Sequence, residues 1–333
     1  MATIFNENSI RPRKLINKQQ RYISDDVKYL LKEKKRFVRI HCPACGSKKE
    51  HLEFYKRGFR YSKCDICQTV YMNPRPTIRI ITNFLARSKN YKYWNDVIFP
   101  ASEQTRKQNI FKPRVDRVLK ICKRHRIPTK QIIEVGCGFG TFLEELKARN
   151  VFSSMIGIEP TPNLAMTCKK KGIETINKTI EEIPAKSLKA NVVVCFEVIE
   201  HIFSPSQFLS ACHNILNDNG IIIITCPNVK GFDMQTLGIV SDTIDHEHLN
   251  YFHLDSLNLL LKKVGFEVIE NQTPGVLDAD LVRNKILEKK FKLQDPFLQI
   301  ILLDQWDKMG TNFQKFLQEN LLSSNMWVVA KKL

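Results

Sequence analysis

The sequence contains no run of eighteen consecutive apolar residues, which is about the minimum length of a helix that spans a bilayer. Residues 6–14 also lack the apolar stretch of a signal peptide, because they include Asn, Glu, Arg and Lys side chains. No internal repeat or low-complexity tract is apparent. These absences argue against a transmembrane or repeat protein, and we expect a cytoplasmic protein.

Cysteine is not scarce, since the chain has ten of them, but their positions argue against a disulfide framework. Cys137, Cys195 and Cys226 each lie inside an apolar run typical of a buried strand. A free cysteine in such a run behaves as a small hydrophobic residue. We therefore expect a reducing compartment.

Acidic residues are scarce in the first part of the chain. Residues 1–130 carry 32 Lys and Arg against 10 Asp and Glu, a balance of +22, whereas residues 131–333 carry 20 against 24, a balance of −4. A basic half indicates an anionic partner, such as a nucleic acid, a sugar nucleotide or a membrane-linked polyanion. The alternative is a Lys-rich composition that only improves solubility.

Two CxxC pairs lie in the basic half, Cys42 with Cys45 and Cys64 with Cys67, separated by eighteen residues. Each pair is typical of a tight turn, and two such turns supply the four thiolates of a tetrahedral zinc site. Aromatic segments between and after the pairs predict hairpin strands. We therefore expect a zinc ribbon over 37–76, with a structural metal, because four thiolates leave no coordination position for water.

The rest of the chain suggests three further regions. Residues 1–36 are expected to form a basic arm, poorly ordered over 1–23, and then a short helix from Ser24 to about Lys35. Residues 77–127 predict a helical linker, in which Pro113 is a point where the helix over 102–126 can break. From 128 to 333 strands and helices alternate, which predicts an α/β fold with a mostly parallel sheet and a helical insertion at 279–321.

A glycine loop follows the first predicted strand of this last region, over 131–135. Gly136, Gly138 and Gly140 form GxGxG, but Thr141 stands where a dinucleotide fingerprint has its third glycine. The loop has no basic residue for a phosphate. Glu159, at the end of the second predicted strand, is an acceptor for both hydroxyls of a ribose in either ligand class. A cationic ligand without phosphate, such as S-adenosylmethionine, fits these residues better than NAD.

Four segments together resemble a class I S-adenosylmethionine-dependent methyltransferase: EVGCGFGTFLEEL, IGIEP, VVVCFEVIEHIFSPSQFL and HLNYFHLDSLNLLLKKVGFEVIE. The resemblance covers roughly residues 110–333 and implies a Rossmann-like seven-stranded sheet whose last strand, over 326–330, is inserted antiparallel. It also implies the cofactor contacts by motif position: Glu134, Gly136, Gly138 and Gly140 for the methionine portion, Glu159 for the ribose, Thr179 and Ile180 for the adenine, and Phe196 and Glu197 beside the sulfonium.

A four-cysteine ribbon ahead of such a domain is similar to methyltransferases of sugar and glycan pathways, notably deoxysugar C-methyltransferases. Those enzymes carry a His-Glu-His run in the loop after the fifth strand, which here reads His246-Glu247-His248. The resemblance implies that His248 is the base and that Glu247 assists it. A Tyr commonly precedes the run in that family, whereas this chain has Asp245. The alternative is that these residues cap the next helix and bind surface water.

Glu197, Glu200 and His201 form a second group of polar residues. On one helical turn they share a face, so they are candidates for a magnesium site like that of ubiquinone-pathway O-methyltransferases, which the motif resembles. We favour a role without metal, because Glu-His after the fourth strand is frequent in the wider family without one.

The sequence therefore predicts methyl transfer from S-adenosylmethionine to a small molecule or glycan, with a sugar nucleotide or glycan-linked sugar as the favoured acceptor. One alternative is an RNA methyltransferase whose basic ribbon binds the backbone, although the loop after the fourth strand lacks an Asn-Pro-Pro-Tyr type of motif. Another is a binding protein that retains the fold without catalysis. The oligomeric state is left open.

Overall fold

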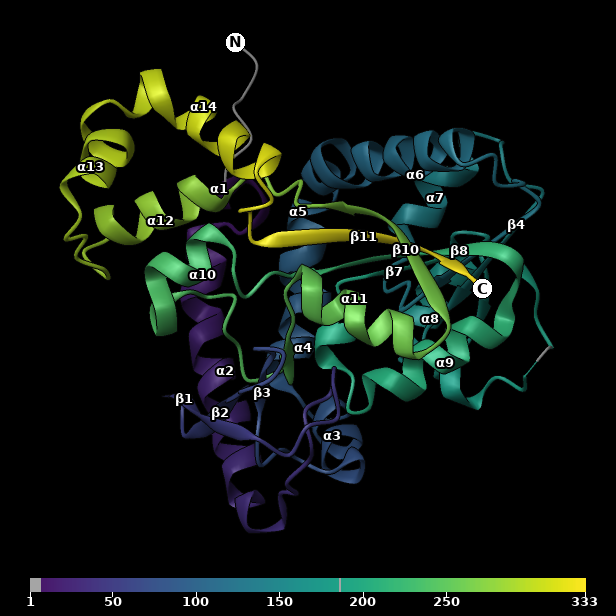
Figure 1. Cartoon of the computed structure of the whole chain (residues 1–333), viewed down its shortest axis with the longest axis horizontal. Coiled ribbons are helices and arrows are strands. Elements are labelled where there is room, and N and C mark those ends of the chain that lie inside the picture. Colours follow the sequence, from purple (N-terminus) through teal and green to yellow (C-terminus); the bar gives the residue numbers. More distant parts are fainter. Residues whose placement is uncertain (1–6, 186) are drawn as a thin grey trace. The chain divides into compact units, whose positions relative to one another are not determined.

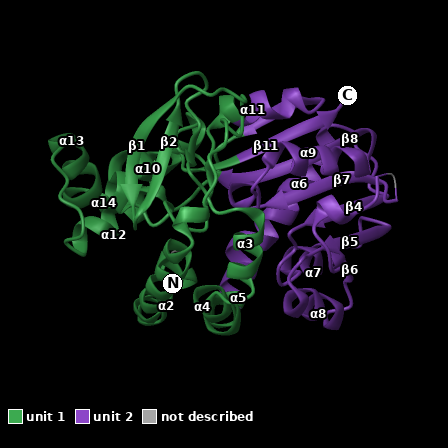
Figure 2. Ribbon diagram, turned by 90° about the horizontal axis from the view of Figure 1, so that it is seen from below, with its two compact units in different colours: residues 1–103, 227–256, 272–326 green, residues 104–226, 257–271, 327–333 purple. Residues whose placement is uncertain are grey.

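The computed structural model describes residues 7–185 and 187–333, and their backbone divides into two compact units (Figure 2). Unit 1 comprises the described residues of 1–103, 227–256 and 272–326. Unit 2 comprises those of 104–226, 257–271 and 327–333. This division differs from the expected single domain over 128–333, because 227–256 and 272–326 belong to the unit that holds the amino-terminal residues.

Unit 2 contains a seven-stranded, mostly parallel sheet in the order β10-β11-β8-β7-β4-β5-β6. Figure 1 labels its strands β4, β7, β8, β10 and β11. The pairs β4–β5, β4–β7, β5–β6 and β7–β8 are parallel. The last strand in the chain, β11, lies between β8 and β10. This sheet confirms the predicted α/β fold. Its strands are β4 (Gln131–Val135), β5 (Ser154–Ile158), β6 (Glu174–Ile176), β7 (Ala190–Phe196), β8 (Leu216–Pro227), β10 (Phe266–Gln272) and β11 (Asn325–Lys332).

Both faces of this sheet are covered. Val192, Val193 and Val194 follow one another in β7, and each has no exposed surface, although successive side chains of a strand point to opposite faces. A strand that is buried on both faces has a continuous run of apolar residues, and this run makes the strand predictable from the sequence. The principal helices of the unit are α6 (Lys112–Arg124), α7 (Thr141–Lys147), α8 (Pro162–Lys170), α9 (Pro205–Ile215) and α11 (Leu254–Lys263), and its short 3₁₀ turns are η4 (Ile180–Glu182) and η5 (Ile199–His201).

Pro113 does not end the long basic helix expected over 102–126. Helix α5 (Phe99–Arg106) continues through a π-helical turn, η3 (Lys107–Phe111), into α6. Pro113 follows the π-helical turn by two residues, and the altered hydrogen-bond spacing of that turn accommodates a residue without a backbone N–H. Val115 and Val118 of α6 pack into the core beside the sheet.

Unit 1 contains a four-stranded antiparallel sheet in the order β1-β2-β3-β9. A tight turn at Arg57 and Gly58, both with positive φ, joins the first two strands. Strand β9 comes from the segment after β8 and pairs with β3, so residues far apart in the sequence complete one sheet. The bounds are β1 (Glu50–Lys56), β2 (Phe59–Cys64), β3 (Val70–Met72) and β9 (Asn250–Tyr251).

The amino-terminal residues differ from the expected arm. Residues 13–23, which we expected to be poorly ordered, belong to a twenty-residue helix, α2 (Arg13–Lys32), which follows a short helix, α1 (Glu7–Ile10). Ile23, Val27 and Leu30 lie on one face of α2 and pack into the core of unit 1. Burial of these three apolar residues stabilises the helix. The polar residues between them obscure the helical spacing in the sequence. Residues 1–6 of the expected arm lie outside the described residues.

The remaining helices of unit 1 fall into two groups. The first lies on either side of the ribbon: η1 (Lys34–Arg36) precedes it, and α3 (Ile78–Leu85), α4 (Lys89–Tyr93) and η2 (Trp94–Ile98) follow it and lead into α5. The second has its own apolar cluster, which includes Leu237, Val282 and Leu302. It comprises α10 (Phe232–Leu237), η6 (Gly238–Val240), α12 (Asp278–Leu287), α13 (Pro296–Gln299), η7 (Ile300–Asp304) and α14 (Trp306–Glu319). Among the described residues, no helix has the length and apolar character that a bilayer crossing requires.

Candidate active site

The glycine loop joins β4 to α7 and adopts a backbone that only glycine tolerates well. Gly136, Gly138 and Gly140 all have positive φ, at +75°, +53° and +68°. A Cβ on Gly136 would lie 2.6 Å from Val198 Cγ2, and one on Gly140 would lie 2.6 Å from Ile173 Cδ1. A Cβ on Gly138 would meet no atom within 4 Å. The outer two glycines therefore allow close packing, whereas the space over Gly138 is open to a ligand.

Hydrogen bonds to the Glu159 carboxylate connect this loop to the end of β5. Its Oε2 accepts a hydrogen bond from the backbone N–H of Gly138 at 2.9 Å, and its Oε1 accepts one from the N–H of Thr161 at 2.9 Å. The side chain is buried, and burial raises its pKa while the backbone donors lower it. Sequence reasoning placed Glu159 at this edge of the sheet but did not foresee its bond to the loop.

Glu134, at the buried end of β4, has an unsatisfied acceptor. Its Oε2 has no hydrogen-bond partner among the described residues, and burial raises the pKa of the carboxyl well above its usual value. The hydroxyl of Thr141, at the start of α7, is also buried without such a partner. A buried polar atom without a partner is costly, so both atoms are suited to a ligand that supplies the missing bond.

Arg114 of α6 is a neighbour of this site that sequence reasoning missed. Its guanidinium carbon lies 4.3 Å from the centre of the Phe196 ring. Burial lowers the pKa of Arg114, and the carboxylates of Glu197 and Glu134 raise it. The one available signal was its position on the apolar face of the helix, because Arg114 precedes Val118 by one turn.

Phe196 ends β7 next to Arg114, and Glu197 follows it. The Phe196 ring also contacts Phe142 and Trp327, with ring centres 5.0 and 5.6 Å apart. Glu197 has a φ of +57°, and its Oε1 accepts a hydrogen bond from Thr225 Oγ1 at 2.6 Å. A left-handed backbone at a residue other than glycine is strained and is often found at functional sites.

The strained backbone of Glu197 also bears on the magnesium hypothesis. The carboxylates and imidazole of Glu197, Glu200 and His201 share a face only on one α-helical turn. Here the left-handed Glu197 precedes a 3₁₀ turn over Ile199–His201. Among the described residues, these three do not form a group of ligand atoms within 4.8 Å of one another. The described residues therefore do not bring these three candidate ligands together.

Thr179 and Ile180 follow β6. Ile180 is buried, whereas Thr179 is exposed and forms a capping box with Glu182, whose carboxylate accepts from the Thr179 N–H at 2.7 Å. The cofactor candidates thus follow the carboxyl ends of the neighbouring parallel strands β4, β5, β6 and β7. Such ends share one edge of a sheet, which is where open α/β folds bind nucleotide-like ligands.

The three predicted catalytic residues lie in unit 1, in the loop before β9. The Nδ1 atom of His248 is 2.8 Å from the carbonyl oxygen of Thr243. Because a carbonyl only accepts, Nδ1 carries the proton and donates it, so Nε2 is the basic nitrogen when the ring is neutral. The imidazole of His248 also packs on the ring of Tyr251.

His246 and Glu247 have a different environment. The imidazole of His246 is buried, with its Nδ1 against an Oδ1 of Asp245. Although burial lowers its pKa, the carboxylates of Asp245 and Glu247 raise it overall. Glu247 Oε1 lies 3.8 Å from His246 Nε2 and accepts from Asn90 Nδ2 at 2.9 Å. His246 therefore acts on Glu247 by charge and not through a hydrogen bond, and its burial argues against a direct role as base.

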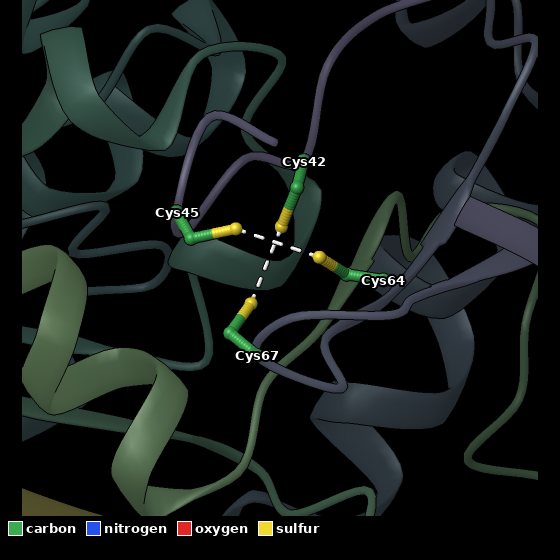
Figure 3. Close-up of side chains that lie close together, drawn as sticks. All are labelled: Cys42, Cys45, Cys64 and Cys67. Atoms are coloured by element: carbon green, nitrogen blue, oxygen red, sulfur yellow. Dashed lines mark hydrogen bonds between the residues drawn. The ribbon is translucent and has the colours of Figure 1, made fainter. Parts of the chain in front are cut away.

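The four cysteines of the expected ribbon converge (Figure 3). All four sulfur atoms lie within 4.8 Å of one another, and the Cys42–Cys67 and Cys45–Cys64 pairs are each 3.4 Å apart. Zinc–sulfur bonds of about 2.3 Å in a tetrahedron place the sulfurs about 3.8 Å apart, so this group fits zinc. The hydrogen bond from Cys42 lowers the pKa of Cys67 to about 4, which favours its thiolate.

The two halves of this cysteine group repeat one local geometry. The N–H of Gly46 donates to the carbonyl of Cys42 at 2.9 Å, and the N–H of Gln68 donates to the carbonyl of Cys64 at 2.9 Å. Gly46 and Gln68 both have positive φ. Two equivalent turns therefore present their thiols to one point, as the CxxC spacing predicted.

The protein family described as "Methyltransferase domain" matches residues 103–271, which is half of the chain. The chain belongs to this family. Several curated relatives of the chain are named S-adenosylmethionine-dependent methyltransferases. The open space over Gly138 and the unsatisfied acceptor of Glu134 fit that cofactor, because it is cationic and brings an ammonium donor.

Curated relatives match the methyltransferase over less than half of its length. A protein of Mycolicibacterium smegmatis named "Probable S-adenosylmethionine-dependent methyltransferase" is 29% identical over 43% of this chain and 54% of its own. The "C-methyltransferase NovU" of Streptomyces niveus is 28% identical over 45% and 36%. The "Ubiquinone biosynthesis O-methyltransferase" of Salmonella paratyphi A is 29% identical over 31% and 44%. The chain thus spans about half the length of these relatives or less.

Two solved structures are similar to this chain. An Archaeoglobus fulgidus "SAM dependent methyltransferase" is 20% identical, with a TM-score of 0.48 over 71% of this chain and 100% of its own. The plantazolicin methyltransferase BpumL, solved with S-adenosylhomocysteine, is 13% identical, with a TM-score of 0.48 over 76% and 93%.

Proposed function

We propose that this methyltransferase acts on a sugar nucleotide or a glycan-linked sugar, with His248 as the base that removes the acceptor proton. The observation that carries the proposal is the hydrogen bond between His248 Nδ1 and the Thr243 carbonyl, because it leaves the other nitrogen basic. The balance of +22 over residues 1–130 supports an anionic acceptor. The relatives include an O- and a C-methyltransferase, so the atom that is methylated stays open.

S-adenosylmethionine supplies a methyl group on a sulfonium, which is already activated. In the proposed complex Glu134 Oε2 accepts from the ammonium group of the methionine portion. Glu159 accepts from the ribose hydroxyls, since a carboxylate has about four acceptor sites and the backbone N–H groups use two of them. The glycine loop holds the methionine portion, Thr179 and Ile180 border the adenine, and Phe196 and Glu197 border the sulfonium.

The chemical step is a displacement at the methyl carbon. The acceptor atom forms a bond to that carbon, the carbon–sulfur bond breaks, and its electron pair stays on the sulfur. His248 Nε2 takes the proton that the acceptor oxygen or carbon loses. Glu247 assists through its carboxylate, which Asn90 Nδ2 orients by a hydrogen bond and which the buried His246 faces at 3.8 Å.

We also propose that the four cysteines bind one structural zinc ion. The convergence of four thiols from two equivalent turns supports this assignment. The metal would join the turn before β1 to the turn after β2, and so stabilise the sheet of unit 1.

The test is a screen of sugar nucleotides with a methyl-labelled donor. We expect label in a sugar product, with mass spectrometry and NMR identifying the methylated atom. RNA is included as a competing acceptor. Label in RNA instead of any sugar, or affinity for RNA that falls steeply with salt, would contradict the proposal. Failure of calorimetry to detect S-adenosylmethionine binding would favour a non-catalytic role.

A further inference from the structure

A small pocket in unit 1 has basic walls and lies outside the residues assigned above. It encloses about 310 Å³. Lys28 and Lys32, one turn apart on α2, form one wall, and Arg87 and Lys89, at the start of α4, form the other. The aromatic rings of Tyr29 and Phe84 complete the apolar part of the lining.

The charges in this pocket are not balanced. Four basic residues face only two acids, Asp25 and Asp26. Asp25 forms an ion pair with Lys89, with Oδ2 and Nζ 2.9 Å apart. Among the described residues, the other three basic residues form no ion pair within 4.0 Å, although Lys28 acts weakly on Asp25. The pocket therefore has excess positive charge.

Asp26 is already counted in this excess, and its carboxylate oxygens accept hydrogen bonds from the start of α4. Its Oδ1 accepts from the N–H of Lys89 at 3.1 Å, and its Oδ2 accepts from the N–H of Asn90 at 3.1 Å and from the hydroxyl of Ser88. These bonds also fix the backbone that carries Arg87 and Lys89. One wall of the pocket is therefore held in position before any ligand binds.

The pocket lies next to the loop that carries the proposed catalytic residues. Ligand atoms of Asp26, His246 and Glu247 lie within 4.8 Å of one another. On the same side, the Phe84 ring packs edge-on against the His246 ring, with centres 5.9 Å apart. Two residues that line the pocket, Asp26 and Phe84, thus contact the His246 and Glu247 pair.

We propose that this pocket binds the diphosphate group of the acceptor, an inference that rests on the proposed function and specifies its substrate class. The volume is near the lower end of ligand pockets, which run from about 300 to 1,000 Å³. Such a volume suits a compact anion better than a whole nucleotide. Arg87 offers a planar pair of donors to phosphate oxygens, and Lys28 and Lys32 offer point charges.

The direct test is calorimetric titration of inorganic pyrophosphate into the full chain at low salt. The test variant carries Lys28→Gln and Lys32→Gln, and a single Arg87→Gln variant probes the opposite wall. The matched control carries Lys14→Gln and Lys120→Gln, which remove the same charge from exposed positions on α2 and α6. We expect the pocket variants to bind pyrophosphate at least tenfold more weakly, and the control to stay within twofold of the wild-type chain.

Two results would overturn the proposal: no pyrophosphate binding by the wild-type chain, or an equal loss in the pocket and control variants. Binding of an RNA oligonucleotide that requires Lys28 and Lys32, without pyrophosphate binding, would overturn it too. Steady-state kinetics separate the two proposals. If sugar nucleotides are methylated and the pocket variants leave KM unchanged, the pocket assignment fails and the function stands. If pyrophosphate binds through the pocket but no sugar nucleotide is methylated, the pocket assignment stands and the proposed function fails.

Discussion

The Glu159 carboxylate accepts a hydrogen bond from the backbone N–H of Gly138 at 2.9 Å. This bond joins the end of one parallel strand to the loop that follows its neighbour. It fixes the open face of Gly138 relative to the acceptor assigned to the ribose. The donor and acceptor positions of the cofactor site are therefore set by the fold before the cofactor binds, which lowers the cost of ordering them.

Glu159→Gln should weaken cofactor binding, in part by loosening the loop, because an amide has only one oxygen to accept from the backbone N–H groups of Gly138 and Thr161. The amide keeps the size of the side chain but loses the charge and one acceptor. Hydrogen bonds to charged groups contribute about 1.5–3 kcal/mol, so we expect the S-adenosylmethionine Kd to rise at least tenfold. Glu174→Gln, at an exposed position on β6, is the matched control. Calorimetry measures both, and equal affinities of the two variants would refute the ribose assignment.

The glycines of the loop should respond differently to alanine. At Gly138 a Cβ meets nothing within 4 Å, so Gly138→Ala costs only about 1–2 kcal/mol for its left-handed backbone. The added methyl fills the space assigned to the cofactor, and we expect a larger loss of S-adenosylmethionine affinity. At Gly136 the Cβ would lie 2.6 Å from Val198, so Gly136→Ala should unfold at lower urea concentration than Gly138→Ala. A lower urea midpoint for Gly138→Ala than for Gly136→Ala would contradict this account.

Glu134 should make the stability of the cofactor-free protein depend on pH. Burial raises the pKa of its carboxyl in the folded protein, so the folded state binds the proton more tightly than the unfolded state. Stability is therefore lost as pH rises from the unfolded pKa through the folded one. We expect Glu134→Gln to be more stable than the wild-type protein at pH 8, and the difference to shrink at pH 4. The same variant should bind S-adenosylmethionine more weakly. Urea unfolding at both pH values measures the first effect.

Most of unit 2 was predictable from the sequence because its signals are local. Buried parallel strands have continuous runs of apolar residues, as in Val192–Cys195, and the three glycines predict the turn after β4. The features that sequence reasoning missed depend on partners far along the chain. Strand β9 has two residues and forms only because Tyr251 pairs with Val70. The roles of Arg114 and Asp26 likewise depend on neighbours that are distant in the sequence. The sequence alone does not distinguish these two residues from the many charged residues that are exposed.

The cysteine group supports a prediction about folding. If it binds zinc, Cys64→Ser should lower the zinc content measured by elemental analysis and unfold the ribbon, because one ligand of four is lost. Cys212→Ser is the control, since Cys212 is also buried but lies in α9, away from the group. Zinc content that is unchanged in Cys64→Ser would end the assignment. A loss in both variants would show general misfolding, and circular dichroism distinguishes this case.

The base assignment makes the sharpest prediction, because a substitution at His248 can keep its contact with Thr243. In His248→Asn the amide nitrogen replaces Nδ1 as a donor to the Thr243 carbonyl, and no basic nitrogen is left. General base catalysis contributes about 10²–10⁴-fold, so we expect kcat to fall by at least 100-fold. The affinity for S-adenosylmethionine should be nearly unchanged, because His248 is not among the proposed cofactor contacts.

Two further variants interpret a loss of activity in His248→Asn. Glu247→Gln keeps an oxygen that accepts from Asn90 but removes the charge, so we expect a smaller fall in kcat than in His248→Asn. His213→Asn, on α9, controls for loss of an imidazole elsewhere and should keep full activity. If His248→Asn loses cofactor affinity while the turnover of bound cofactor is retained, the residue positions the cofactor and is not the base. A kcat within threefold of the wild-type value would also reject the assignment, because no loss of proton transfer would then be visible.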